Sequence, residues 1–257
     1  MFTHIFIFLM IFSLSPLSLG YDFLALSLSW PKGYCATLPC TSSPPPNIFT
    51  LHGLWPSNIN QTDPQSCPHT IQFPDNSVIE KTWNHDLLTN MKKITFSPKT
   101  QFSLWKHEWT FHGTCMESKS VTHSQLDAAD PQAYYFDSIY AYFKNANDLV
   151  SKLAGEANVK PGQEYDAITL LNAVNKVIGS DVSIKCRVSS HDNKQHLVEV
   201  ILYLDKNLQH TNVFDAVAKF RSRCDMKKKI IYAGSHLRAS KELYLMSYHL
   251  DDYIYSA

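Results

Sequence analysis

The sequence lacks the patterns that mark several widespread kinds of functional site. It contains no C-x-x-C pair, which argues against a zinc ribbon and against a thioredoxin-like redox site. It has no glycine-rich loop of the kind that holds a phosphate, and its expected helices and strands do not alternate in a regular βαβα order. This order of elements predicts a single α+β domain.

An excess of charge of either sign is also lacking. The chain has 23 lysines and arginines against 23 aspartates and glutamates, so its formal net charge is zero with histidine neutral. This balance excludes a tight binder of nucleic acid that works through bulk charge alone. Twelve histidines would make the protein strongly positive below their ordinary pKa of about 6.5.

Long hydrophobic runs are absent beyond the N-terminus. Residues 1–20 have a dense apolar middle at 5–12, with the small residues Ser18 and Gly20 at the −3 and −1 positions of a cleavage site. We therefore predict a secretory signal peptide over residues 1–20. Pro16 interrupts the run before it reaches the roughly 20 apolar residues of a membrane span, so a membrane anchor is the weaker alternative.

The cysteines agree with a secreted protein. Six of them lie after residue 20, and an even number in a secreted chain predicts three disulfides. Asn60, in the sequence Asn60-Gln61-Thr62, is the single N-x-S/T acceptor and a candidate for glycosylation.

Strands are predicted from alternating or β-branched apolar runs. Residues 23–30 alternate with period two, residues 48–56 form a second short strand, and the run at 197–204 is typical of a central strand. Residues 227–231 complete the last strand. The polar, proline-rich stretch from 57 to 75 is predicted to be irregular.

Two helices are predicted from capping residues and apolar spacing. Asp130 is an N-cap with Pro131 at the first helical position, and the helix continues through the segment 133–153. A second helix occupies 166–179 and ends with Gly179. We assign the aromatic residues of these helices to the core rather than to a ligand site.

The densest group of reactive side chains lies in "LWKHEWTFHGTC" (104–115). On a regular helix, His107, Glu108, Phe111 and His112 fall within an arc of about 140°. Zinc proteases use H-E-x-x-H, whereas the spacing here is H-E-x-x-x-H, which turns the second imidazole about 140° from the first. No obvious third ligand follows, so metal-dependent hydrolysis is the weaker interpretation.

Acid–base chemistry on RNA needs two histidines and no metal. The ribose 2′-hydroxyl is the nucleophile; one imidazole removes its proton and the other protonates the departing 5′-oxygen. His52, at the end of the second predicted strand, is the candidate partner for the histidines of the 104–115 segment. A lone histidine is more often structural, but His52 and His112 both lie in segments rich in tryptophan and glycine.

These segments resemble a known family. "FTLHGLWP" (49–56) and "WKHEWTFHGTC" (105–115) are similar to the two active-site segments of the ribonuclease T2 family. The resemblance extends to "LSLSWP" (26–31) and to 159–186, covers about 21–224, and is closest to the plant branch of self-incompatibility and S-like ribonucleases. It implies a disulfide-linked domain with a central antiparallel sheet flanked by helices.

The resemblance also implies roles for individual residues. His52 and His112 would form the acid–base pair, with His112 favoured as the base. His107 would bind the phosphate, Glu108 would assist as a carboxylate, and Trp55 would support the site. The implied disulfides are Cys35–Cys40, Cys67–Cys115 and Cys186–Cys224.

Three departures from the family pattern affect these expectations. Phe111 replaces the lysine that steadies charge on the phosphoryl oxygens, and loss of one such donor costs about 10²–10³-fold in rate. Ser29 replaces a glutamine that helps to hold a base. Tyr203 and Ala216 together replace the two cysteines of a further disulfide found in many plant relatives.

The sequence therefore predicts a secreted, monomeric endoribonuclease that needs no metal or cofactor and acts on single-stranded RNA through a 2′,3′-cyclic phosphate. We place its domain at 21–232, followed by an extension of unknown role at 233–257. A protein partner is expected if the chain acts in self-incompatibility, although its near-neutral charge favours an S-like role in RNA turnover. The alternative is a catalytically impaired relative that serves in RNA binding, storage or partner recognition.

Overall fold

The computed structural model describes the greater part of the chain between Gly20 and Gly234. The described residues are 20–59, 62–68, 72–117, 131–146, 148–205, 209–211 and 223–234. The predicted signal peptide, apart from Gly20, lies outside these ranges. So do Asn60, Ala216 and the predicted C-terminal extension beyond Gly234.

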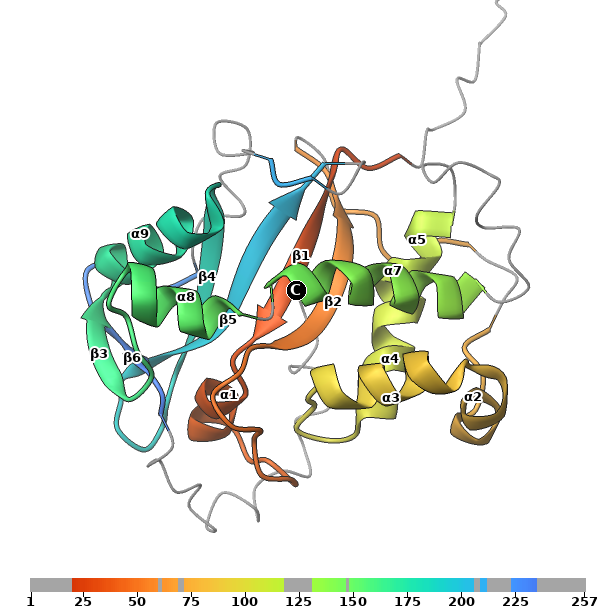
Figure 1. Cartoon of the computed structure of the whole chain (residues 1–257), viewed down its shortest axis with the longest axis horizontal. Coiled ribbons are helices and arrows are strands. Elements are labelled where there is room, and N and C mark those ends of the chain that lie inside the picture. Colours follow the sequence, from red (N-terminus) through yellow and green to blue (C-terminus); the bar gives the residue numbers. More distant parts are fainter. Residues whose placement is uncertain are drawn as a thin grey trace, which may run out of the picture.

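Helices and strands are interspersed in the α+β order expected from the sequence (Figure 1). The N-terminal half contains β1 (Phe23–Ser29), α1 (Pro31–Thr37), β2 (Thr50–Ser57), α2 (Asn76–Thr82), α3 (His85–Ile94), α4 (Gln101–Glu108), the π-helix η1 (Trp109–Gly113) and α5 (Thr114–Glu117). The C-terminal half contains α7 (Pro131–Ala146), α8 (Leu149–Glu156), β3 (Gln163–Asp166), α9 (Ala167–Ile178), β4 (Val182–Val188), β5 (Gln195–Leu204) and β6 (Lys229–Tyr232).

One sheet contains all six of these strands, in the order β2-β1-β5-β6-β3, with β4 paired to β5 outside this path. The ladders are antiparallel except for a short parallel pairing of β5 with β6. The strands predicted at 23–30, 48–56, 197–204 and 227–231 are confirmed. Figure 1 shows α8 and α9 at one end of the sheet, α2 to α5 at the other, and α7 crossing between them.

Strand β1 lies inside the sheet between β2 and β5. Every one of its residues is buried, so both of its faces are covered by other parts of the protein. Leu24, Leu26 and Leu28 belong to the main core under the helices, as their alternation predicts. The opposite face carries a smaller apolar cluster that includes Phe23 and Ala25. On this second face the strand also carries polar side chains, and there the sheet meets the candidate site.

The helix boundaries follow the capping residues of the sequence, with one difference. Helix α7 begins at Pro131, as predicted, but the helix expected through 133–153 is two helices: α7 ends at Ala146 and α8 begins at Leu149. Helix α9 ends where predicted, because Gly179 adopts the left-handed conformation (φ +78°) that glycine reaches without steric cost.

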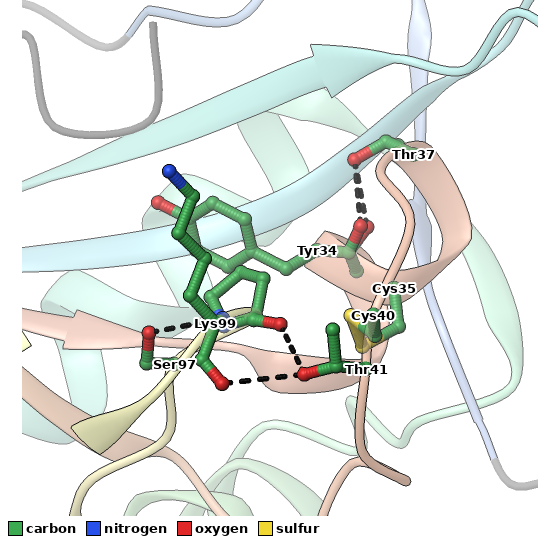
Figure 2. Close-up of a disulfide and its surroundings, with 9 residues drawn as sticks. Tyr34, Cys35, Thr37, Cys40, Thr41, Ser97 and Lys99 are labelled. Atoms are coloured by element: carbon green, nitrogen blue, oxygen red, sulfur yellow. Dashed lines mark hydrogen bonds between the residues drawn. A yellow bond between two sulfur atoms is a disulfide. The ribbon is translucent and has the colours of Figure 1, made fainter. Parts of the chain in front are cut away.

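Three disulfides join the same cysteines that the family resemblance implies: Cys35–Cys40, Cys67–Cys115 and Cys186–Cys224. Beside the first of them, Thr41 donates a hydrogen bond to the carbonyl of Pro98, at 2.7 Å, and so ties this loop to the segment before α4 (Figure 2).

Tyr203 occupies one position where many plant relatives have a cysteine. Its buried ring packs edge-on against Phe23, with ring centroids 5.8 Å apart, and its hydroxyl lies 2.5 Å from Ser183 Oγ. The tyrosine therefore fills the position with a packed and hydrogen-bonded side chain.

Among the described residues, none of the helices has the length and apolar character needed to cross a bilayer.

Candidate active site

The segment 104–115 is not the regular helix that its sequence predicts. Helix α4 ends at Glu108, and Trp109–Gly113 form a π-helix before α5 resumes. A π-turn holds one residue more than an α-turn, so side chains five positions apart come onto one face. His107 and His112 accordingly lie with ring centroids 6.0 Å apart. The expected separation of about 140° between these two imidazoles is wrong for this reason.

His52 comes to the site from strand β2, where the ladder is irregular. Ser27 of β1 pairs with Gly53 and Leu28 pairs with Leu51, so His52 is an extra residue in a β-bulge. A bulge of this kind redirects a side chain at the point where it is inserted. The imidazole is thereby placed among three charged side chains: Glu108 of α4, Glu199 of β5 and Lys185 of β4.

Glu108 is held in a close contact with strand β2. Trp55 Nε1 donates a hydrogen bond to Glu108 Oε2 at 2.9 Å. A Cβ atom on Gly53 would lie 1.8 Å from the same oxygen, so only glycine leaves room for the carboxylate. The second oxygen, Oε1, lies 3.4 Å from His52 Nε2 and has no hydrogen-bond partner among the described residues.

Trp55 contacts both histidines that the sequence nominates as an acid–base pair. Its ring meets His52 edge-on at 5.3 Å and His112 at 5.5 Å between centroids. The tryptophan therefore packs against both imidazoles and, through its indole N–H, also orients Glu108. The structure thus brings together His52, Trp55, His107, Glu108 and His112.

The two histidines have pKa shifts of opposite sign. Burial lowers the pKa of His112 to about 3, and the neighbouring charges of His107 and His52 act in the same direction. Burial would also lower the pKa of His52, but the charge and hydrogen bond of Glu199 and the charge of Glu108 outweigh it. The net pKa of His52 is raised, although Lys185 opposes the rise.

Glu108 is fully buried, and burial raises its pKa to about 7 against the opposing effects of the His52 charge and the Trp55 hydrogen bond. Its carboxyl group can therefore exchange a proton near neutral pH, whereas an ordinary glutamate cannot. This property suits a group that assists proton transfer beside two imidazoles.

Phe111 projects from the same π-helix. Its side chain is 39% exposed, and its ring stacks on His107 with centroids 4.4 Å apart. The position expected to carry a lysine therefore presents an apolar face beside the phosphate-binding candidate. No cation replaces the lysine on η1 itself, whose five residues are Trp109, Thr110, Phe111, His112 and Gly113.

The turn from α4 into the π-helix also brings together three side chains that could bind a metal, although the spacing on a regular helix made a metal site the weaker interpretation. His107, Glu108 and His112 each offer one ligand atom, and these atoms lie within 4.8 Å of one another. Two imidazoles and one carboxylate are a common donor set for transition metals. Chelation is therefore a necessary control in any test of this site.

Sequence reasoning missed two charged residues, Glu199 and Lys185, that lie on the Nδ1 side of the His52 ring. Glu199 Oε1 lies 3.1 Å from His52 Nδ1, and Lys185 Nζ lies 3.5 Å from Glu199 Oε2. The missed signal was a single charged residue inside the apolar run 197–204, where an unpaired charge is costly. Ser29, nominated for base binding, is buried in β1 between Thr50 and Glu199 of the neighbouring strands.

His52 on the antiparallel sheet, His112 on the π-helix and the buried carboxylate of Glu108 form a group of side chains suited to acid–base chemistry. The model described as the ribonuclease T2 family matches residues 21–216, and the chain belongs to this family. Extracellular ribonuclease LE of Solanum lycopersicum is 31% identical over 195 residues, which cover 72% of this chain and 76% of that protein. Intracellular ribonuclease LX of the same plant is 29% identical over 200 residues, covering 74% and 76%.

A solved structure of RNase NT in complex with 5′-AMP superimposes with a TM-score of 0.61 at 24% identity. The match covers 83% of this chain and 98% of the other. At this level of identity the likeness concerns the fold, which the two proteins share.

Proposed function

We propose that the protein is a metal-independent endoribonuclease in which His112 is the general base and His52 the general acid. The observation that carries this proposal is the opposite pKa shift of two histidines that both pack against Trp55. Groups whose environments separate their pKa values in this way are suited to opposite protonation roles. Membership of the ribonuclease T2 family supports RNA as the substrate.

In the proposed reaction, neutral His112 takes the proton of the 2′-hydroxyl as the 2′-oxygen attacks phosphorus. Protonated His52 gives its proton to the 5′-oxygen, whose bond to phosphorus breaks, leaving a 2′,3′-cyclic phosphate and a free 5′-hydroxyl. Water then opens the cyclic phosphate slowly, with the two histidines exchanging roles. His107 faces the phosphate, and Glu108 Oε1, which lies 3.4 Å from His52 Nε2 and has no hydrogen-bond partner among the described residues, assists the transfer of protons.

The rate is proposed to be attenuated. Phe111 supplies no charge to a transition state that is more negative than the substrate, so one donor of the usual set is missing. The same feature supports the alternative of a catalytically impaired RNA-binding or partner-binding protein. The presence of His52, His107, Glu108 and His112 in one cluster favours the enzyme.

The test is cleavage of single-stranded RNA between pH 4 and 8 in excess EDTA. We expect turnover in wild type, and a loss of about 10²–10⁴-fold in each of His52→Ala and His112→Ala, the range for a general acid or base. His191→Ala is the matched control, because its side chain is exposed on the turn between β4 and β5. Activity that needs added metal, or that survives both histidine changes, contradicts the proposal.

We also propose that the protein is secreted and acts as an S-like ribonuclease in RNA turnover. The apolar N-terminal run, the three disulfides and an extracellular relative support secretion. A zero net charge favours turnover over self-incompatibility. N-terminal sequencing of the secreted product should begin at Tyr21, and a product that retains residues 1–20 argues against this part.

A further inference from the structure

Glu199 is a buried carboxylate that the proposed reaction does not itself require. It lies in the middle of β5 with none of its side chain exposed to solvent. In the sheet it is opposite Ser29 of β1 on one side and Lys185 of β4 on the other. An ionised carboxylate at such a place is very costly unless its oxygens are fully partnered.

Each oxygen of Glu199 has two polar partners. Oε1 accepts a hydrogen bond from the Tyr34 hydroxyl and lies 3.1 Å from His52 Nδ1. Oε2 accepts from Ser27 Oγ at 3.3 Å and lies 3.5 Å from Lys185 Nζ. With these donors the carboxylate is stable in its charged form, and its pKa is lowered even though burial would raise it.

The partners come from four different elements, which fixes Glu199 independently of the substrate. Tyr34 belongs to α1, and the Cys35–Cys40 disulfide links this helix to the loop that follows it. Figure 2 shows the Tyr34 side chain extending away from that disulfide. Ser27 is in β1, and Lys185 is in β4. The carboxylate is therefore held rigidly at one end of the His52 ring.

The other end of the ring faces the reaction. His52 Nε2 lies 3.4 Å from Glu108 Oε1, and the His52 ring also packs edge-on against Trp55, which contacts His112. A histidine whose Nδ1–H is donated to a carboxylate has its tautomer and ring orientation fixed by that bond. Nε2 is then the nitrogen that can carry a proton to or from a substrate.

We propose that Glu199 is the positioning residue of the general acid: it binds the Nδ1–H of His52 and aims Nε2 at the leaving oxygen. The inference rests on the proposed role of His52. A buried ion pair kept only for stability is the competing explanation. That explanation predicts that a folded Glu199→Gln protein keeps the wild-type kcat even though the pKa of His52 falls.

Several charged or titratable groups shift the pKa of His52, some upward and others downward. Glu199 and Glu108 favour its charged form, whereas Lys185 and a protonated His112 oppose it. Glu199→Gln keeps the shape but removes the charge, so the pKa of His52 should fall. Lys185→Met removes the opposing cation, so the pKa of His52 should rise.

The test measures the pKa of His52 by NMR in the full-length secreted protein with labelled histidine, assigning its resonance from its absence in His52→Ala. Kinetics on RNA run in parallel. We expect Glu199→Gln to lower the pKa of His52, to move the alkaline limb of the pH–rate profile to lower pH, and to reduce kcat about 10²-fold with KM nearly unchanged. Asp192→Asn is the matched control, because it alters another histidine–carboxylate contact, in which the exposed Asp192 lies 3.0 Å from the buried His196.

The outcomes separate the two proposals. A folded Glu199→Gln protein with the wild-type kcat, or with an unchanged His52 pKa, overturns the positioning role. If that variant does not fold, Glu199→Asp takes its place, because it keeps the charge but withdraws the carboxylate from His52 Nδ1, and a wild-type kcat in that variant overturns the positioning role. Because NMR needs no turnover, a shifted His52 pKa in a protein that never cuts RNA shows the Glu199–His52 contact while rejecting the proposed function.

Discussion

Phe111 is the residue at which the site departs most from the active-site pattern of the ribonuclease T2 family. Its ring stacks on His107 and leaves 39% of the side chain exposed, so a longer charged side chain can be accommodated there. We predict that Phe111→Lys raises kcat by about 10²–10³-fold, because an ammonium group would stabilise charge on the phosphoryl oxygens. Steady-state kinetics on a short RNA measures the change.

The matched control for this prediction is Phe111→Met, which removes the aromatic stack without adding charge. It should leave kcat close to the wild-type value. Equal rises in both variants would show that the ring obstructs the site, and the argument from the missing cation would then be wrong. No rise in either would mean that the site works without a cation at this position.

The opposite pKa shifts of the histidines predict a broad pH optimum on the acidic side of neutrality. The base, His112, stays neutral down to about pH 3, and the acid, His52, stays protonated to above its ordinary value. The pH profile of kcat/KM reports these groups in the free enzyme. Its acid limb should therefore lie well below pH 6.5 and its alkaline limb above it. Two limbs crowded around one ordinary histidine pKa would contradict this assignment.

At the scale of secondary structure, the sequence predicts elements whose determinants are local. Alternation places β1, Pro131 marks the start of α7, and Gly179 ends α9, since each depends on the conformation of a few neighbouring residues. The resemblance to family segments identifies His52 and the histidines of the 104–115 segment without any need for geometry.

Two features of the site lie beyond such reasoning. The π-helix at Trp109–Gly113 replaces a regular turn because tertiary contacts, including the packing of Trp109 in the core, determine its register. Glu199 meets His52 only because β1 joins their two strands, and that pairing spans 147 residues of sequence. Residue spacing contains no information about either contact.

The Cys67–Cys115 disulfide is the covalent link between the loop after β2 and helix α5, which directly follows the π-helix. It encloses 48 positions, against 5 for Cys35–Cys40. The chain-entropy model assigns about 4 kcal/mol to the longer loop and about 2 kcal/mol to the shorter. We predict that Cys67→Ala/Cys115→Ala loses that stability and most of the activity, because His112 precedes Cys115 by three residues.

Cys35→Ala/Cys40→Ala is the control for the longer disulfide. It should cost less in urea unfolding, and activity in the folded protein should persist. Equal activity losses in the two double variants would show that the Cys67–Cys115 link does not position the catalytic segment specifically.

At the scale of the whole molecule, charge balance sets how RNA is attracted. The net charge is zero with histidine neutral, and protonation of histidines other than His112 adds positive charge on acidification. Each phosphate contact to single-stranded nucleic acid contributes a slope of about −0.7 to log K against log salt. We predict that KM for RNA depends more steeply on salt at pH 5 than at pH 7. Hydrolysis of a 2′,3′-cyclic mononucleotide, which has one phosphate, is the control and should show a smaller change.

The central claim is that RNA supplies the nucleophile while His52 and His112 move the protons without a metal. The most direct measurement uses an RNA oligonucleotide and a copy with a single 2′-deoxyribose at the main cleavage position, both incubated with the protein in EDTA at pH 5. Mass spectrometry should find a 2′,3′-cyclic phosphate from the first and no cleavage at the modified position in the second. Cleavage of the second oligonucleotide at the modified position, or products that end in a 5′-phosphate, would contradict the account.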